Sequence, residues 1–377
     1  MTEPFGQEPS RRASGDHREI VVVGSGQAGL AVGYFLKQQR RDYVILEAAN
    51  APAAAWRARW DSLKLFTPAR YDSLPGRAFP GEPDSYPGRD DVVAYLTDYA
   101  ESRELPVEVN SPVRAVRQAT GGYIVELTDR AYTAQQVVIA TGPFQVPRVP
   151  PVAGPLDSAV VQIHSTAYRR PDQMPPGPVL VVGGGNTGFQ IAQELSRSHE
   201  VHLSIGSRQT PLPQRIAGRD LFHYLDAIGI MRVTVKSRLG RRLSHRETLI
   251  GSSPRAAQRQ HGIRLRGRTV DAQGSEVVFA DGTRLAPASV IWSTGFAVDH
   301  SFVKVPVFDD AARLMHRRGV TAAPGLYFLG LTWQYTRGSA LLGWVKHDAE
   351  FIAQRVEQFA RRGQAPPMVT DEQPAFR

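Results

Sequence analysis

The chain has 377 residues, of which 42% are hydrophobic and 21% charged, as in ordinary globular proteins of two or three domains. Its net charge is +9, from five lysines and forty arginines against 36 acidic residues, and it has no cysteine. The lack of cysteine excludes disulfides, thiolate metal sites and a redox-active cysteine pair. No apolar stretch approaches the ~20 residues that span a bilayer, so we expect a cytoplasmic protein without a membrane segment.

Residues 1–18 are polar and contain Pro, Ser and Gly, which predicts a disordered tail. A glycine-rich turn then follows the apolar run 20–23 and precedes a helical pattern over 30–37. Glycines at this spacing make a tight turn, let the backbone approach a pyrophosphate and let helix and strand pack closely. The phosphate then meets free N–H groups at the helix N-terminus. The residues predicted to hold this dinucleotide are Gly24, Gly26, Gln27, Ala28 and Gly29.

The next apolar strand, 43–46, ends in Glu47. A carboxylate at this point accepts hydrogen bonds from an adenosine ribose. We therefore predict that the first turn binds FAD.

A second turn of the same design follows the apolar run 179–182. Two copies, each between a strand and a helix, are far more specific than one. The second set of predicted contacts is Gly183, Gly185, Asn186, Thr187 and Gly188.

The strand after the second turn, 201–205, is followed by Ser207 and Arg208 and has no acidic residue at its end. Arg208 can pair with a 2′-phosphate and Ser207 can donate to it, whereas a carboxylate would repel it. We predict NADPH at this site, with NADH possible. The alternative for Arg208 is a solvated surface arginine.

Two tryptophans, in the segments Trp56-Arg57 and Trp60-Asp61, follow Glu47. They either cover one face of a flavin ring or pack in the core. Val113 to Val138 alternates and contains a Gly-Gly turn, which predicts a small antiparallel meander. It runs into a buried strand that ends at Thr141-Gly142.

A similar strand ends at Thr294-Gly295, after which we expect the chain to return to the first domain. The predicted fold is α/β, with two nested Rossmann-like dinucleotide-binding domains of the glutathione-reductase type and a small antiparallel β-meander. The predicted boundaries are a disordered tail over 1–18, the first part of the FAD-binding domain over 19–155, an inserted NADPH-binding domain over 156–285, and the second part of the FAD-binding domain over 286–377.

The last informative stretch, 325–340, predicts a buried strand, a loop, and a helix that starts near Ser339 and continues through Val345. A helix N-terminus aimed at the flavin would stabilise negative charge on its pyrimidine edge. The alternative is a helix that only closes the sheet. Candidate catalytic groups are Gln334 and Thr336 near the flavin, where Gln334 would also contact the cofactor, and Asn186 near the nicotinamide nucleotide.

Residues 236–268 are densely basic. Nucleic-acid binding is disfavoured because no aromatic residue is interleaved for base stacking. We interpret the stretch as a solvated excursion that raises the potential near the phosphates of NADPH.

The sequence resembles the class B flavin-containing monooxygenases, particularly compact bacterial ones close to the plant YUCCA enzymes. The resemblance covers Glu19 to Arg355. Where the family fingerprint has Phe and Gly, this chain has Ser158 and Val160. The likeness rests on both glycine turns, Trp56-Arg57, 63–65, 140–142, 293–295 and His164 to Tyr168.

The resemblance implies a cycle in which NADPH reduces the flavin, O2 adds as a C4a-(hydro)peroxide, and one oxygen atom passes to a nucleophilic N or S centre or a ketone. It implies a small-molecule substrate and no metal, no nucleic acid and no strong acid-base pair, and it leaves a homodimer possible. His164 is interpreted as a hydrogen-bonding residue of the domain linker. Alternatives are an NAD(P)H:flavin dehydrogenase or oxidase, and a redox-sensing flavoprotein. The resemblance extends the FAD contacts to Trp56, Arg57, Val113, Thr141, Gly142 and Gln334, and the nucleotide contacts to Thr294 and Gly295.

Overall fold

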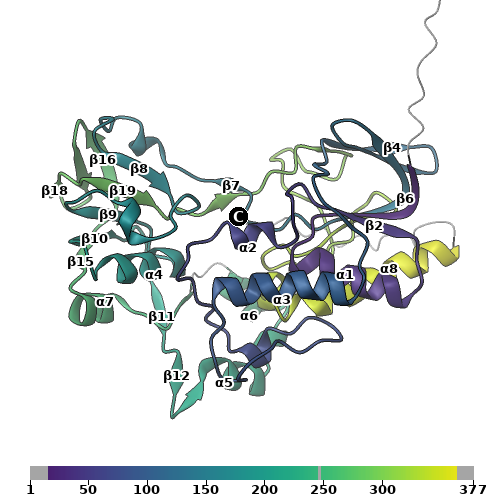
Figure 1. Ribbon diagram of the computed structural model, residues 1–377, viewed down its shortest axis with the longest axis horizontal. Helices are drawn as coiled ribbons and strands as arrows, with labels where there is room; N and C mark the ends of the chain where they lie inside the picture. Colours follow the sequence, from purple (N-terminus) through teal and green to yellow (C-terminus); the bar gives the residue numbers. More distant parts are fainter. Residues whose placement is uncertain (1–15, 245–247, 363–377) are drawn as a thin grey trace, which may run out of the picture.

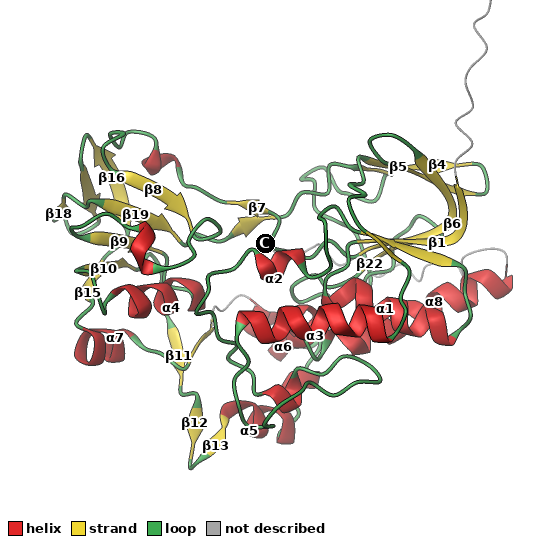
Figure 2. Ribbon diagram, in the orientation of Figure 1, coloured by secondary structure: helices red, strands yellow, loops and turns green. Residues whose placement is uncertain are grey.

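The structure is a computed structural model that describes residues 16–244 and 248–362 (Figure 1). Two sheets lie at opposite ends of the molecule, each with helices on one side (Figure 2). Most of the predicted tail falls outside the described residues, but Asp16 to Arg18 already belong to the first strand. The sheets therefore give the two-unit α/β architecture that the glycine turns predict.

The first sheet has eight strands in the order β21-β4-β5-β6-β1-β2-β3, with β22 also paired to β6. β1 pairs with β2 and β6 in parallel, whereas β4, β5 and β6 form the predicted antiparallel meander. The strands are β1 (Asp16–Val23), β2 (Tyr43–Leu46), β3 (Val107–Glu108), β4 (Ala115–Ala119), β5 (Gly122–Glu126), β6 (Ala131–Ile139), β21 (Val303–Lys304) and β22 (Leu326–Phe328).

The central strand β1 is buried on both faces. Alternate side chains of a strand point to opposite faces, so Ile20 and Val22 enter one core while Val21 and Val23 enter the other. The first core also holds helices α1 (Gln27–Gln38), α3 (Arg89–Ser102) and α8 (Val345–Arg362), which pack together beneath the sheet (Figure 2).

The second sheet has five parallel strands in the order β15-β10-β9-β19-β8. Its helices are α4 (Asn186–Leu195) and α7 (Pro254–His261), and the small antiparallel sheet β16 (Thr269–Gln273), β17 (Glu276–Phe279) and β18 (Arg284–Leu285) packs beside it. The strands are β8 (Val161–His164), β9 (Val179–Val182), β10 (Val201–Ser204), β15 (Arg264–Arg266) and β19 (Ser289–Trp292).

Strand β19 corrects one boundary of the sequence analysis. The division at residue 286 places it in the first unit, but β19 pairs with β8 and β9 in the second sheet. A buried strand followed by a Thr-Gly turn occurs in both units, so the pattern alone does not say which sheet the strand joins. The chain leaves the second sheet only after Trp292.

The two connections between the units lie side by side. β7 (Val146–Pro147) pairs antiparallel with β20 (Phe296–Ala297), between the two sheets (Figure 1). The chain thus enters and leaves the second unit through one short two-stranded ribbon.

An excursion of the second unit, residues 210–250, packs on the first unit. The Tyr86 hydroxyl donates to Asp220 Oδ2 across 2.7 Å, and the Val235 N–H donates to the Tyr335 carbonyl across 2.9 Å. The basic stretch that the sequence analysis interprets as solvated, 236–268, begins in this excursion, where Arg238, Arg241 and Arg242 are exposed. It continues through α7 and β15 of the second unit, and the exposed arginines there are Arg255, Arg259, Arg264 and Arg268. Its elements are β11 (Thr210–Leu212), β12 (Arg215–Ile216), β13 (Arg219–Asp220), α5 (Leu221–Ala227), a 3-10 turn (Ile230–Arg232), α6 (Arg238–Ser244) and β14 (Thr248–Ile250).

The C-terminal helix starts later than the sequence predicts. A 3-10 helix, η5, covers Arg337–Ala340, and the backbone is extended at Leu341 before α8 begins at Val345. The Thr336 hydroxyl caps η5 by accepting from the Gly338 N–H, and this cap closes a separate short turn. None of the described helices is long and apolar enough to cross a membrane. The remaining short helices are α2 (Ala54–Arg57), Ala69–Tyr71, Pro151–Ala153 and Pro171–Gln173.

Candidate dinucleotide sites

The first glycine turn needs glycine at two positions for steric reasons. Gly24 has a φ of +104°, and a Cβ atom there would lie 2.7 Å from the Ala140 carbonyl oxygen. A Cβ atom on Gly29 would lie 1.9 Å from the Gly24 carbonyl oxygen. At Gly26, by contrast, no described atom of another residue would come within 4 Å. The middle glycine therefore faces open space at the start of α1, where a phosphate can reach free N–H groups.

The second turn repeats this geometry. Gly183 has a φ of +131°, and its added Cβ would lie 2.2 Å from the Ser293 carbonyl oxygen. A Cβ on Gly188 would lie 2.0 Å from the Gly183 carbonyl, while one on Gly185 would meet no described atom within 4 Å. Both turns thus combine a rigid, glycine-dependent base with a middle position that is open to a ligand, which fits a dinucleotide at each.

Glu47 lies beside the first turn, and its carboxylate is oriented by the chain. Oε2 accepts from the Ser25 N–H at 3.0 Å and from the Ser25 hydroxyl at 2.6 Å, and Oε1 accepts from the Ala49 N–H at 3.0 Å. The carboxylate is fixed at the carboxyl end of β2, where the sequence predicts contact with a ribose.

Ser207 and Arg208 lie in an exposed loop three to four residues after β10. Arg268 joins them: its Nη2 donates to the Gly206 carbonyl across 2.8 Å. Because β10 and β15 are parallel neighbours, the residues that follow them meet at one edge of the sheet. Arg268 was missed as a site residue, although this pairing of strands would have indicated it.

The two Thr-Gly turns, Thr141-Gly142 and Thr294-Gly295, are held by hydrogen bonds to the segments that connect the two units. The Gln145 amide donates to Thr141 Oγ1 and to the Gly142 carbonyl, at 2.8 and 2.7 Å. Thr294 Oγ1 donates to the Arg148 carbonyl, and His164 Nε2 lies 3.1 Å from the Gly295 carbonyl. Burial lowers the pKa of His164, while its contact with the Gly295 carbonyl raises it. His164 thus connects the end of β8 to the turn that leads into β20, which agrees with its interpretation as a hydrogen-bonding residue of the domain linker.

The two tryptophans have different environments. Trp56 Nε1 donates to Gln27 Oε1 across 2.9 Å, and the Gln27 amide donates to the Ala340 carbonyl across 3.2 Å. Trp60 instead packs in the core of the second unit. Arg57 is exposed and donates to Thr97 and to the Pro52 carbonyl, while Val113 packs against the first sheet.

The three predicted catalytic side chains all bond to the chain itself. Asn186 donates to the Thr248 carbonyl and accepts from the Ile250 N–H, and so attaches β14 to the start of α4. Gln334 is 2% exposed and bonds to the Phe328 carbonyl and the Leu331 N–H. Thr336 caps η5. Contacts of these groups with a cofactor stay a prediction.

Asp72 is a buried acid that sequence reasoning missed. It is 1% exposed; Oδ1 bonds to the Thr67 hydroxyl across 2.7 Å, and Oδ2 has no partner in the described part of the chain. Burial raises its pKa to about 8, while the hydrogen bond with Thr67 lowers it. Its loop packs against Gly343, just before α8.

A pocket of about 190 Å³ lies between the two units. Lys64, Leu65 and Phe66 of the first unit form one wall, and α4 and β14 form the other. Its polar lining is mostly amides, from Asn186, Gln190, Gln193 and Gln214. Within 16–244 and 248–362, no group of three or more His, Cys, Asp or Glu is placed to hold a metal ion.

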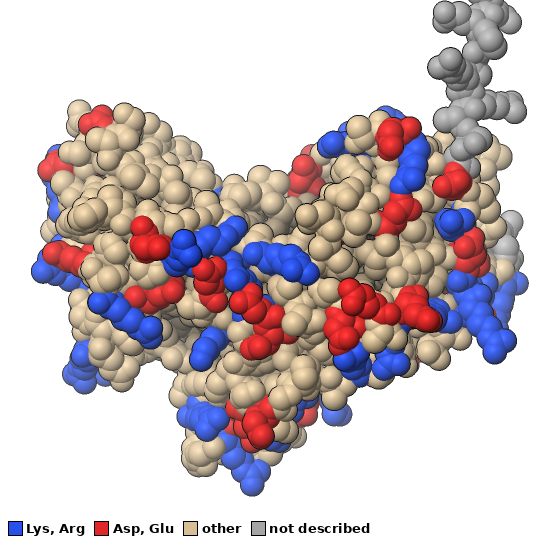
Figure 3. All heavy atoms as spheres, in the orientation of Figure 1, with Lys and Arg blue, Asp and Glu red and all other residues tan. Residues whose placement is uncertain are grey.

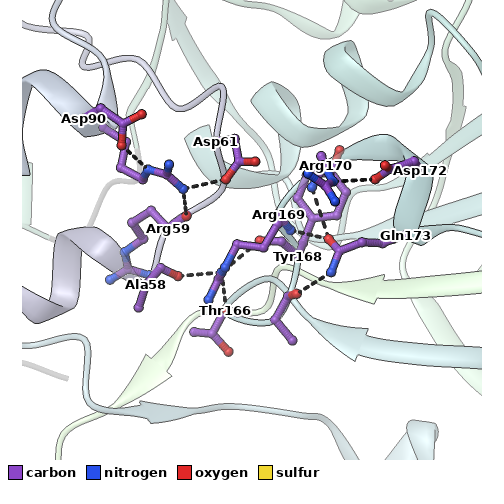
Figure 4. Close-up of polar contacts among 12 residues, drawn as sticks. Ala58, Arg59, Asp61, Asp90, Thr166, Tyr168, Arg169, Arg170, Asp172 and Gln173 are labelled. Carbon is purple, nitrogen blue, oxygen red and sulfur yellow. Dashed lines mark hydrogen bonds and ion pairs between the residues drawn. The ribbon is translucent and has the colours of Figure 1, made fainter. Parts of the chain in front are cut away.

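A network of backbone and arginine contacts joins the units next to α2 (Figure 4). Arg169 Nη1 donates to the carbonyls of Ala58 and Thr166, both at 2.8 Å, and the Asp61 N–H donates to the Arg169 carbonyl at 2.9 Å. Arg89 donates to the Arg59 carbonyl at 3.0 Å and pairs with Asp61. On the face shown in Figure 3, the surface is hollowed between the two lobes, and Lys and Arg side chains gather beneath the hollow.

Two nested dinucleotide folds with matching glycine turns are typical of an oxidoreductase of the two-dinucleotide type. Residues 21–215 match the family described as pyridine nucleotide-disulphide oxidoreductase. An uncharacterised CzcO-like oxidoreductase of Geobacillus kaustophilus is 42% identical over 336 residues, 89% of this chain and 97% of that protein. The chain therefore belongs to the pyridine nucleotide-disulphide oxidoreductase family, although without cysteine it cannot use disulphide chemistry itself.

Two further relatives place the chain beside monooxygenases. The flavin-containing monooxygenase of Stenotrophomonas maltophilia has a similar structure, with a TM-score of 0.77 and 29% identity over 92% of this chain and 99% of that one. The rice indole-3-pyruvate monooxygenase YUCCA1 is 34% identical over 208 residues, 54% of this chain and 51% of that protein. The predicted resemblance to flavin-containing monooxygenases is confirmed, and the chain is an enzyme of this flavin-dependent oxidoreductase group.

Proposed function

We propose that the protein is an NADPH-dependent FAD monooxygenase that transfers one atom of O2 to a small nucleophilic N or S compound or a ketone. One observation carries this proposal: two turns of the same geometry, each open at its middle glycine, lie in units joined by one short ribbon. The names of the Stenotrophomonas and YUCCA relatives support the class of reaction.

In this proposal the first turn and Glu47 hold FAD, and the second turn with Ser207 and Arg208 holds NADPH. When bound there, FAD would supply the redox chemistry, in which a hydride comes from NADPH and the reduced flavin reacts with O2. The chain binds and orients both nucleotides and keeps water away from them. Aromatic rings from three parts of the chain pack together and support this proposal: Phe66 stacks on Phe222 at 5.9 Å, and Tyr71 stacks on Trp344 at 5.5 Å.

The test is anaerobic reduction of the FAD-loaded protein with NADPH or NADH, followed by mixing with O2 and recording of the flavin spectrum. We expect faster reduction by NADPH and then a blue-shifted spectrum that persists while NADP⁺ is bound. Immediate return of the oxidised spectrum would contradict the monooxygenase and support an NAD(P)H oxidase. A protein that stays colourless after refolding with FAD would refute both.

A further inference from the structure

No described residue supplies a counter-ion to the Arg59 side chain. Among the described residues its guanidinium makes no hydrogen bond or ion pair; only its backbone carbonyl takes part in the network of Figure 4. Its Cζ lies 5.0 Å from the centre of the Phe296 ring and 5.4 Å from that of Phe144. The guanidinium thus lies against two aromatic rings that contact each other, and its N–H groups have no partner among the described residues.

Arg59 contacts two segments, and each of them follows a turn that packs against one of the two glycine turns. Phe144 follows the turn Thr141-Gly142, and the Ala140 carbonyl oxygen just before this turn packs against Gly24. In the same way, Phe296 follows the turn Thr294-Gly295, and the Ser293 carbonyl oxygen packs against Gly183. Phe144 and Phe296 are themselves in edge contact at 5.4 Å, next to the ribbon of β7 and β20. Arg59, which comes from the first unit, therefore reaches the segments that follow both turns.

The local charge is positive and uncompensated. Burial and the nearby charge of Arg169 both lower the pKa of Arg59, and Arg59 in turn helps to lower the pKa of His164. A half-buried cation without a partner is costly, and a planar guanidinium is the side chain best suited to a phosphate. Phe144 is 55% exposed, so the guanidinium stays open on that side to a ligand from solvent.

We propose that Arg59 binds a phosphate oxygen of the nicotinamide half of NADP(H), a contact that rests on the proposed function. We assign the adenosine half of the nucleotide to Ser207 and Arg208, in the exposed loop that follows β10. Arg59 approaches the second turn from the first unit, so the half of the nucleotide that points toward the flavin is the one within its reach. The contact ties the nucleotide to both units at once.

The test is calorimetric titration of FAD-loaded Arg59→Met with NADP⁺, nicotinamide mononucleotide and 2′,5′-ADP. We expect NADP⁺ and the mononucleotide to bind about ten- to a hundredfold more weakly and 2′,5′-ADP to bind as to the wild type. Arg117→Met is the matched control, because Arg117 is an exposed arginine of the first unit whose guanidinium pairs with Glu126 on the neighbouring strand. It should leave all three affinities unchanged. Arg59→Lys keeps the positive charge but lacks the paired N–H donors of the guanidinium, so we expect a smaller loss of NADP⁺ affinity. This variant also tests the proposal if Arg59→Met does not fold.

Four outcomes would overturn the proposal. Unchanged NADP⁺ affinity in Arg59→Met refutes it while leaving the proposed function intact. Equal losses for NADP⁺ and 2′,5′-ADP would show that Arg59 acts on the unit as a whole. Loss of FAD with normal NADP⁺ affinity would assign Arg59 to a phosphate of the flavin nucleotide instead. A wild-type protein that binds none of the three ligands would refute the proposed function together with this contact.

Discussion

Gly29 lies directly against the carbonyl oxygen of Gly24: a Cβ atom on Gly29 would be 1.9 Å from that oxygen. Because the blocking atom belongs to the backbone, it cannot move aside as a flexible side chain does. We expect Gly29→Ala to destabilise the protein by about 1–3 kcal/mol or more, measured by denaturant unfolding. An unchanged unfolding midpoint would contradict the tight packing of this turn.

Gly26→Ala should behave in the opposite way. An added methyl group there meets no described atom within 4 Å, so the fold should tolerate it. It would occupy the space that we assign to the FAD pyrophosphate. We expect near-normal unfolding but little bound flavin, measured by the ratio of flavin to protein absorbance. Full flavin retention would show that the pyrophosphate does not approach this glycine.

Gly185→Ala tests the second turn in the same manner. The space beside Gly185 is open, and Gly188→Ala, which meets the Gly183 carbonyl, is the matched destabilising variant. Gly185→Ala should retain FAD and weaken NADP⁺ in a calorimetric titration. If NADP⁺ bound normally, the second turn would not be its site.

Arg208→Ala should weaken NADPH by roughly ten- to a hundredfold and leave NADH nearly unchanged, because only NADPH carries a 2′-phosphate. Arg268→Ala should show a smaller effect of the same kind, since Arg268 is bonded to Gly206 one residue before Ser207. The measurement is the dissociation constant for each nucleotide. Equal losses for both nucleotides would assign Arg208 another role.

Asp72→Asn should change the pH dependence of stability. Burial raises the pKa of Asp72 from 3.8 to about 8, so between these values the folded protein binds a proton that the unfolded chain releases. This group therefore destabilises the native state progressively as the pH rises from about 4 to 8, by at most about 1.4 kcal/mol per pH unit. Asparagine keeps the hydrogen bond with Thr67 and does not ionise.

The measurement is the melting temperature at several pH values. Relative to the wild type, Asp72→Asn should gain stability between pH 4 and 8 and show a constant difference above that. The exposed Asp129→Asn is the control. Parallel curves for Asp72→Asn and the wild type would mean that Asp72 ionises normally in the folded protein.

The sequence predicted those parts of the fold that are determined by residues close together in the chain. Glycines at fixed spacing, alternating strands and the meander were all visible because neighbours in sequence determine them. Strand β19 was assigned to the wrong sheet because its pairing with β8 and β9 joins segments more than 100 residues apart. The docking of the excursion, through Asp220 on Tyr86, is long-range in the same way.

The candidate site shows the same division. The glycines, Glu47 and Arg208 follow from their place after a strand, whereas Arg59 has no sequence signal that separates it from the other arginines. Its role depends on Phe144 and Phe296, which come from two distant connections. The polar residues Asn186, Gln334 and Thr336 are ambiguous in sequence because the same side chains cap turns and attach strands.

The ribbon formed by β7 and β20 has a consequence for how such enzymes diversify. Because the inserted unit begins and ends at neighbouring strands, its two ends are adjacent in space. A recombination event that replaces everything between them exchanges a whole cassette without cutting either sheet. The residues that we propose set nucleotide preference lie in that cassette together with the excursion that packs on the first unit, so exchanging it would change coenzyme choice and leave the first sheet intact.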